Sequence, residues 1–256
     1  MNRALLYISF FSLYTFSAFA YVVLIDPGHG GEELGAITRV WVKTKKMKKT
    51  QNIYEKDLAL KLARKVKARL EKKYTTYLTR SVDRTVTLNE RANMAETVKA
   101  DLFISIHFNS STNSKSKGFE TYYLDNHADK AIKKIENIEN KYLIGAEKTI
   151  NQILIDLVIQ KTVPTSKKLA NSIHNELKEN ISKKFKMKDR GIKPGLFYVL
   201  ALSKRPGVLI EAGFMSNKKE LEKIKSSKFL NTYAKSISDG VISYLNSLPA
   251  KDIPLF

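Results

Sequence analysis

The chain has 256 residues, of which 43% are hydrophobic, 11 are glycine and 6 are proline, a composition typical of a folded protein with one ordinary core. It contains no cysteine, which excludes disulfides, cysteine-ligated zinc and thiol nucleophiles, so that any metal site must use histidine and carboxylates. Its 45 Lys and Arg residues against 25 Asp and Glu give a net charge of +20, which favours polyanionic partners.

The first twenty residues have the pattern of a secretory signal peptide. Arg3 gives a positive start, residues 4–16 form an uncharged apolar run, and residues 18–20, Ala-Phe-Ala, form a cleavage site. An uncleaved membrane anchor is the alternative, because residues 4–25 carry no charge. We favour the signal peptide, since residues 21–25 are needed as a first strand. The expected location is the periplasm, reached by the general secretory route, with no stable membrane span and no nucleic-acid partner.

Strand and helix patterns alternate along the rest of the chain. Strands are predicted at residues 21–25, 74–79, 101–107, 118–124, 196–200 and 207–212. Helices are predicted at residues 54–73, 88–99, 166–184 and 228–248, with a short one after Asn217. The basic stretch 39–49 is expected to be a solvated loop or hairpin. The alternation predicts one α/β sandwich over residues 21–256, with a mostly parallel, roughly six-stranded sheet flanked by helices, and a helical insertion at 125–164.

Four residues carry the chemistry that the sequence suggests. His29 follows the first strand in a glycine-rich loop, and His107 and Glu211 stand at the ends of two other strands, where ligand sites of α/β sheets gather. Glu55 opens a helix. Two histidines and one carboxylate around a metal, with one open position and a second carboxylate as general base, form a catalytic zinc arrangement. Each residue also has an ordinary alternative, such as a first-turn charge for Glu55 or a salt bridge for Glu211.

Five segments resemble the zinc-dependent N-acetylmuramoyl-L-alanine amidases of bacterial cell walls, in the order that the family has them. They are residues 23–31, 54–57, 79–83, 102–110 and 209–217. The resemblance implies one Zn²⁺ held by His29, Glu55 and His107, with Glu211 as the catalytic carboxylate. It implies a peptidoglycan substrate, cut between N-acetylmuramic acid and L-alanine, in daughter-cell separation or wall turnover. We expect a monomer.

Two departures from the family pattern lie between the first histidine and the glutamate ligand. Residues 39–52 are a longer, basic insert, for which binding to wall polymers and to membranes both stay open. The usual Asp-Pro-Gly-Ala is replaced by Glu-Leu-Gly-Ala at 33–36, which keeps Glu32 and Glu33 as alternatives to Glu55. The Glu-Lys-Asp sequence at a helix start favours Glu55. His127 and His174 match no family ligand and are predicted to lie on the surface.

The insertion at 125–164 resembles the regulatory insertion of the septal branch of these amidases, in which a helical glutamate blocks the zinc. The matching residue is Glu139, which shares a helical face with apolar residues; a salt bridge to a lysine is the alternative. A second apolar helix at 149–161 carries Ile153, Leu154 and Leu157. The resemblance implies that it binds an activator protein, and the alternative is that it packs on the sheet.

Two other functions are alternatives to the predicted amidase activity. Another zinc peptidase or carboxypeptidase acting on wall peptides would use the same metal set with a different groove. A basic wall-binding module without activity would account for the positive charge. Such a module would not require the four candidate site residues, which are His29, Glu55, His107 and Glu211.

Overall fold

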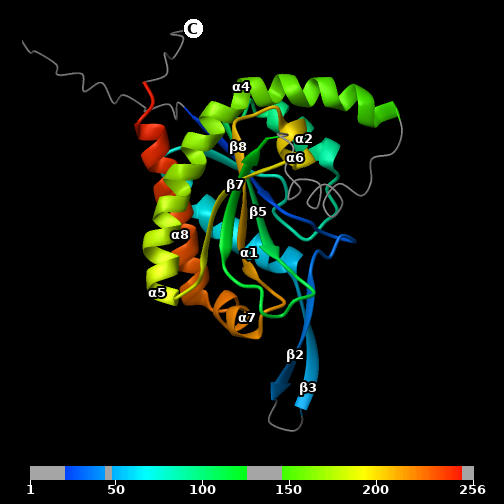
Figure 1. Cartoon of the computed structure of the whole chain (residues 1–256), viewed down its shortest axis with the longest axis vertical. Helices are drawn as coiled ribbons and strands as arrows, with labels where there is room; N and C mark the ends of the chain where they lie inside the picture. The colour runs from blue at the N-terminus through cyan, green and yellow to red at the C-terminus, as the bar shows by residue number, and fades with distance from the viewer. Residues whose placement is uncertain (1–20, 44–47, 126–145, 250–256) are drawn as a thin grey trace, which may run out of the picture.

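The structure is a computed structural model that describes residues 21–43, 48–125 and 146–249, with the backbone alone at 42–43, 48 and 146–154 (Figure 1). The predicted signal peptide at 1–20 and Glu139 both lie outside the described residues. In the part of the chain that is described, no helix has the length and apolar character needed to cross a membrane.

Six strands form the central sheet, in the order β4-β1-β5-β8-β6-β7. They are β1 (Val22–Pro27), β4 (Thr75–Leu78), β5 (Leu102–Asn109), β6 (Phe119–Leu124), β7 (Asp189–Gly195) and β8 (Gly207–Phe214). Neighbouring strands are parallel except β6 and β8, which run antiparallel. The mostly parallel six-stranded sheet predicted from the sequence is therefore confirmed.

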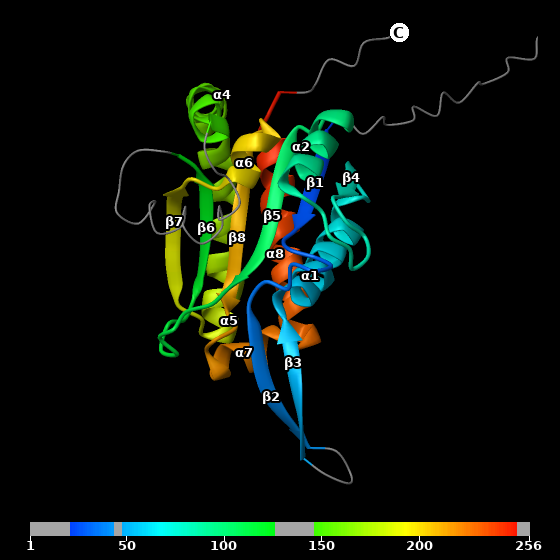
Figure 2. The ribbon, with the colours of Figure 1, turned by 90° about the vertical axis from the view of Figure 1, so that its right-hand side faces the viewer.

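Helices cover both faces of the sheet (Figure 2). The helices are α1 (Glu55–Leu70), α2 (Leu88–Thr97), α4 (Ala146–Leu177), α5 (Lys183–Phe185), α6 (Tyr198–Ser203), α7 (Lys218–Ile224) and α8 (Ser227–Asn246), with a π-helical turn at Lys178–Ser182. Because successive strand residues point to opposite faces, β1 divides its side chains between two cores. Val23 joins the core under α1 and α8, whereas Leu24 joins the core under α2 and α6. A capping box formed by Thr87 and Glu90 begins α2, at the start of the helix predicted at 88–99.

The predicted boundary near Pro164 is wrong, because α4 runs through this residue as one helix. A proline inside a helix removes one backbone hydrogen bond and can bend the helix without ending it. Figure 1 shows α4 changing direction along its length, first crossing one end of the sheet and then descending beside α8. Ile155 and Ile159 in the first part are buried against the second core. The end of the predicted insertion is thus part of a core helix.

The strand predicted at 196–200 is also wrong. The sixth strand is β7, and the apolar run that follows it leads into α6. A short run that is buried on all sides has no periodicity to separate a strand from a helix. Among the described strands, β7 pairs only with β6, and its Pro194 is tolerated because the strand lies at the edge of the sheet.

The basic stretch forms a hairpin, one of the two alternatives expected for it. Its strands β2 (Ile37–Lys43) and β3 (Lys48–Tyr54) make a separate antiparallel sheet. At its base the Thr38 hydroxyl donates to the Met215 carbonyl at 3.0 Å, and Val40 and Ile53 pack on the core. Beyond that base the hairpin projects from the body of the protein (Figures 1 and 2).

Candidate metal centre and catalytic cleft

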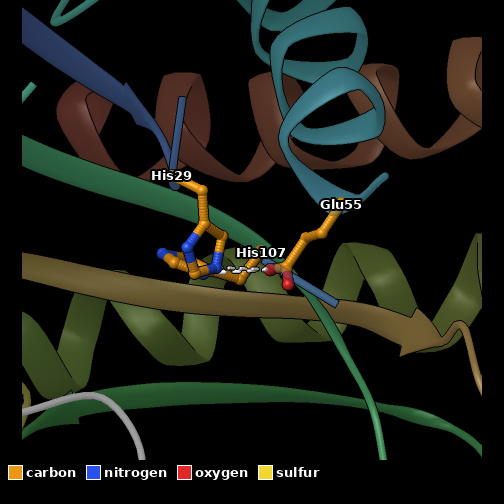
Figure 3. A group of neighbouring side chains, drawn as sticks. All are labelled: His29, Glu55 and His107. Carbon is orange, nitrogen blue, oxygen red and sulfur yellow. Dashed lines mark hydrogen bonds and ion pairs between the residues drawn. The ribbon is translucent and has the colours of Figure 1, made fainter. Parts of the chain in front are cut away.

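His29, Glu55 and His107 converge from three elements at one end of the sheet (Figure 3). His29 lies in the loop after β1, Glu55 is the first residue of α1, and His107 lies near the end of β5. Glu55 Oε1 is 3.2 Å from His29 Nε2 and 3.1 Å from His107 Nδ1. Each residue offers one ligand atom, and the three atoms lie within 4.8 Å of one another. Two imidazole nitrogens and a carboxylate oxygen at this spacing suit a divalent transition-metal ion.

The Glu55 carboxylate is held ionised in a buried position. Burial alone would raise its pKa, but the two histidines outweigh that effect and the pKa falls well below its usual range. Backbone N–H groups hold both oxygens: Ala36 donates to Oε2 at 2.8 Å, and Phe108 donates to Oε1 at 3.0 Å. A charged carboxylate oriented in this way is prepared to bind a cation.

The loop that carries His29 approaches the other two side chains very closely. A Cβ added at Gly28 would lie 2.3 Å from the His107 ring, and one at Gly35 would lie 2.6 Å from His29 and 2.7 Å from Glu55. His29 itself has φ 58°, a left-handed conformation that costs a non-glycine residue free energy unless the surroundings impose it. The glycines around His29 are therefore needed to bring the three ligand atoms together.

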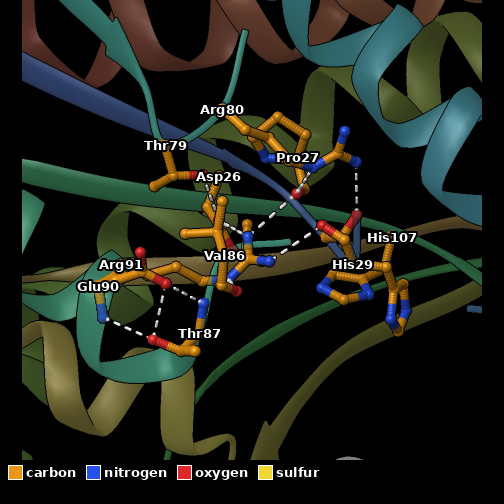
Figure 4. A network of polar contacts seen from close by, with 12 residues as sticks. Asp26, Pro27, His29, Thr79, Arg80, Val86, Thr87, Glu90, Arg91 and His107 are labelled. Atoms are coloured by element: carbon orange, nitrogen blue, oxygen red, sulfur yellow. Dashed lines mark hydrogen bonds and ion pairs between the residues drawn. The ribbon is translucent and has the colours of Figure 1, made fainter. Parts of the chain in front are cut away.

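Two buried arginines impose this loop conformation by binding its carbonyl oxygens (Figure 4). Arg80 donates from Nε to the Pro27 carbonyl at 3.0 Å and from Nη2 to the Gly28 carbonyl at 2.8 Å. Arg91 donates from Nη1 to the Pro27 carbonyl at 3.1 Å and from Nη2 to the His29 carbonyl at 3.0 Å. Each carbonyl from Pro27 to His29 is thus fixed by a guanidinium group.

Asp26 anchors one of these arginines. Its carboxylate forms an ion pair with Arg91 and accepts hydrogen bonds from the hydroxyls of Thr79 at 2.6 Å and Ser105 at 2.8 Å. Burial alone would raise the pKa of Asp26. The ion pair with Arg91 and the hydrogen bond from Thr79 lower the pKa by more, so it lies below the ordinary value. Sequence reasoning did not identify Asp26, Arg80 or Arg91 as part of the site. A charged residue at the end of an apolar strand was the available signal for Asp26.

Glu211 stands beside His107 on the next strand. The two residues are register partners on β5 and β8, and Glu211 is 8% exposed. Both line an open cleft of about 840 Å³, together with His29, Glu55 and an apolar wall that includes Tyr122 and Phe197. The cleft can hold a substrate with its reacting bond between the three converging side chains and the Glu211 carboxylate.

A second buried carboxylate, Glu120, lies next to Glu211 across the β6–β8 pair. Glu120 is 2% exposed and forms ion pairs with Arg190 and Lys193. It also accepts hydrogen bonds from the Tyr122 hydroxyl at 3.0 Å and the Asn109 amide at 3.2 Å. No sequence pattern singles out Glu120, because its partners come from β5, β6 and β7.

The other acidic and histidine candidates fall outside the converging group. Glu32 and Glu33 line the same cleft, but among the described residues only His29, Glu55 and His107 meet at ligand distance. His174, predicted on the surface, is 4% exposed; its Nδ1 lies 2.9 Å from the Thr121 hydroxyl and its Nε2 lies 2.8 Å from Asp189. The second half of α4 packs against the sheet, which is why this helix residue is buried. His127 lies outside the described residues.

The predicted partner-binding residues are only partly visible. Ile153 and Leu154 belong to α4, but only their backbone is described. Leu157 is 58% exposed, whereas Ile155 and Ile159 on the same helix are 3% and 7% exposed. This part of α4 is therefore attached to the body by one face and presents Leu157 to solvent.

Comparisons with known proteins point to one enzyme family. A family model described as N-acetylmuramoyl-L-alanine amidase matches residues 23–243. The chain is 31% identical over 223 residues to the amidase LytC of Bacillus subtilis strain 168, an alignment that covers 87% of this chain and 35% of that relative. It is 30% identical to the amidase AmiC of Escherichia coli strain CFT073, covering 87% of this chain and 52% of that relative. The chain thus spans between a third and about half of these two relatives.

Solved structures are similar over nearly the whole described chain. An N-acetylmuramoyl-L-alanine amidase from Clostridium difficile 630 is 31% identical with a TM-score of 0.65, covering 90% of this chain and 99% of that one. The CwlD amidase from Clostridioides difficile, solved in complex with the GerS lipoprotein, is 26% identical with a TM-score of 0.63, covering 88% of this chain and 98% of that one.

Proposed function

The chain belongs to the family of N-acetylmuramoyl-L-alanine amidases, and on that premise we propose that it hydrolyses the amide joining N-acetylmuramic acid to L-alanine in peptidoglycan. The observation that carries the proposal is the meeting of His29, Glu55 and His107 beside Glu211 in one open cleft. A binding module without activity would have no need of this arrangement.

We propose that these three side chains hold one zinc ion. The donor set fits: two histidines and one carboxylate are a common ligand set of hydrolytic zinc, which keeps a further position for water or substrate. When bound, zinc would lower the pKa of water towards neutrality and polarise the amide carbonyl. Hydrogen bonds from the Ala36 and Phe108 backbone to Glu55, and from Arg91 to the His29 carbonyl, would hold these ligands in place in the metal-free protein.

We propose that Glu211, which stands beside His107 in the cleft, is the general base and acid. Its carboxylate would take the proton of the attacking water and then return it to the nitrogen of the leaving L-alanine, which departs as a free amine. A proton transfer of this kind typically contributes ~10²–10⁴-fold to the rate.

Analysis of the products of purified peptidoglycan tests the proposal and separates it from its rivals. The amidase releases stem peptides with a new amino-terminal L-alanine and leaves both the glycan strands and the peptide cross-links intact. A zinc peptidase or carboxypeptidase would instead cut inside the peptides, and a binding module would release nothing. Either of these patterns would remove the proposal.

The location and physiological role follow from the substrate. Peptidoglycan lies outside the cytoplasmic membrane, so we propose export to the periplasm directed by residues 1–20, with a role in daughter-cell separation or wall turnover. The apolar run and the Ala-Phe-Ala sequence at 18–20 support this assignment. Detection of a mature amino terminus at Tyr21 in the exported protein would test it.

Control of the activity is proposed to involve the first part of α4 and the segment before it. Glu139 would block the metal site in the resting enzyme, and an activator protein would dock on the helix that carries Ile153, Leu154 and Leu157. The exposed Leu157, on a helix whose Ile155 and Ile159 are buried, supports a docking face. The complex of the CwlD amidase with a lipoprotein is a parallel in a structural relative.

A further inference from the structure

The β2–β3 hairpin carries an exposed aromatic side chain that belongs to neither of the two described core clusters. Trp41 is 75% exposed, and Ile37 on the same strand is 52% exposed. A tryptophan commonly buries 150–250 Å² of surface in a core or an interface. Neither exposed residue belongs to the two core clusters, which at the hairpin base take Val40 and Ile53 instead.

The outer face of the hairpin is a continuous row of side chains. Because alternate strand residues share a face, Ile37, Arg39 and Trp41 lie on the face opposite to Val40. Across the pair they stand against Tyr54, Asn52 and Thr50. Side-chain hydrogen bonds join this row, from Arg39 Nε to Asn52 Oδ1 at 3.4 Å and from Asn52 Nδ2 to the Tyr54 hydroxyl at 3.3 Å.

This row begins at the catalytic cleft and leads away from it. Ala36 and Glu55, the residues immediately outside the hairpin, both line the cleft. Thr50, the partner of Trp41, lies five residues before Glu55. At roughly 3.4 Å per strand residue, Trp41 is therefore about 17 Å along the hairpin from the metal centre. A single muramoyl peptide with its scissile bond in the cleft does not need to reach this far, whereas a polymer strand does.

The chemistry of the row matches a glycan strand with acidic stems. An indole ring stacks on the apolar C–H face of a sugar, and its N–H remains available to a hydroxyl. The row adds amide, phenol and guanidinium groups, and a guanidinium group binds a carboxylate in two-point fashion. Residues 39–49 contain six basic residues and no acidic one, which complements a polymer whose peptide stems bear carboxylates.

We propose that the outer face of the hairpin, formed by Ile37, Arg39, Trp41, Asn52 and Tyr54, is a second binding site for the peptidoglycan strand, beyond the unit being cleaved. This inference rests on the proposed function for the identity of the polymer. An anionic membrane is the competing partner for a basic hairpin with a tryptophan. The exposed apolar residues of the described hairpin, Ile37 and Trp41, are separated by Arg39 and bordered by hydrogen-bonded polar groups, which favours a sugar polymer over a lipid interior.

Co-sedimentation of the metal-loaded full chain with purified peptidoglycan sacculi, briefly and on ice, tests the site. Trp41→Ala should weaken binding about tenfold, which corresponds to ~1.4 kcal/mol. Hydrolysis of a soluble muramoyl-peptide monomer should proceed at the wild-type rate. Tyr77→Ala is the matched control, since Tyr77 is also an exposed aromatic on a strand, at 44% exposure, and its loss should leave sacculus binding unchanged.

Three results separate the alternatives. Wild-type sacculus binding by Trp41→Ala would overturn the proposal. If Trp41→Ala loses binding to vesicles that contain anionic lipid but binds sacculi as the wild type does, the proposal is overturned in favour of a membrane site. If Glu139→Ala, in which the proposed block is removed, releases no amino-terminal L-alanine from sacculi while the wild-type chain still binds them through Trp41, the proposed amidase function fails and the hairpin site stands.

Discussion

His107 and Glu211 are register partners on the adjacent parallel strands β5 and β8, so an imidazole of the candidate metal centre and a buried carboxylate lie side by side on one face of the sheet. Strand pairing fixes this relationship, and loop motion cannot change it. Glu55 approaches His107 from the start of α1, within 3.1 Å. The pairing brings together, in one cleft, the two groups that the proposed hydrolysis requires: a ligand for the metal ion and a carboxylate to transfer a proton.

Removal of a metal ligand should act differently from removal of a buried structural histidine. His29→Ala and His107→Ala should each lose bound zinc and hydrolysis together, because each removes one of three ligands. His174→Ala is the control: it should keep about one zinc per chain but lower the free energy of unfolding by on the order of 2 kcal/mol, since Thr121 and Asp189 lose a buried partner. Metal analysis and thermal unfolding measure both effects. Retention of full activity by the metal-free protein would end the zinc hypothesis.

The arginines that hold the His29 loop should influence metal affinity without touching the metal. Arg91→Lys keeps the charge but cannot bind Asp26 and the Pro27 and His29 carbonyls together. We expect zinc affinity to fall ~10–100-fold, the usual range for groups that orient ligands. Arg64→Lys is the control, since Arg64 also binds a carbonyl, that of Ser81, but in an exposed position. Competition with a chromophoric chelator gives both affinities, and equal values would mean that the loop holds His29 without Arg91.

Asp26 predicts how the stability of the metal-free protein depends on pH. The folded-state pKa of Asp26 lies below the ordinary value of 3.8. At pH values between these two pKa values, the unfolded chain binds more protons than the native one. The stabilisation is present above about pH 4 and is lost as the pH falls through the folded-state pKa. Asp26→Asn should be less stable than the wild type at neutral pH and should lose less stability on acidification. Denaturant unfolding at several pH values measures this, and parallel pH profiles for the two proteins would contradict it.

The proposed control of activity makes a prediction of its own. Glu139→Ala should raise the resting rate of hydrolysis without any partner, because a tethered carboxylate competes with water at high effective concentration. Leu157→Asp should fold normally, since Leu157 is exposed. It should keep the low resting rate and lose activation by the docking protein. Rates compared at equal zinc content decide the matter: no gain in Glu139→Ala would mean that Glu139 does not block the site.

Much of the fold was predictable because local patterns agree with the tertiary structure. The buried strands β1, β5 and β8 each contain an apolar run, and helix starts carry visible caps at Thr87 and Asn217. The resemblance to the amidases then selected Glu55 from several acidic residues, and the structure brings Glu55, rather than Glu32 or Glu33, to the two histidines.

The predictions that proved wrong, and the network that was not predicted, concern residues whose conformation or burial depends on tertiary contacts. The run at 196–200 is apolar throughout because it leads into α6, which packs against α2, α4 and the sheet, so its periodicity says nothing about its conformation. His174 is buried because its partners Thr121 and Asp189 come from distant strands. Arg80 and Arg91 lie more than fifty positions after the segment 26–29 that they hold, and no spacing in the sequence reveals this network.

The measurement that tests the central claim most directly is the release of amino-terminal L-alanine from peptidoglycan by Glu211→Gln and by wild type at equal zinc content. The account predicts that Glu211→Gln binds zinc as tightly as wild type and turns over ~10²-fold or more slowly, whereas Glu55→Ala loses the zinc itself. Wild-type turnover by Glu211→Gln would contradict the account. Loss of zinc from Glu211→Gln but not from Glu55→Ala would show that the two carboxylates have exchanged roles.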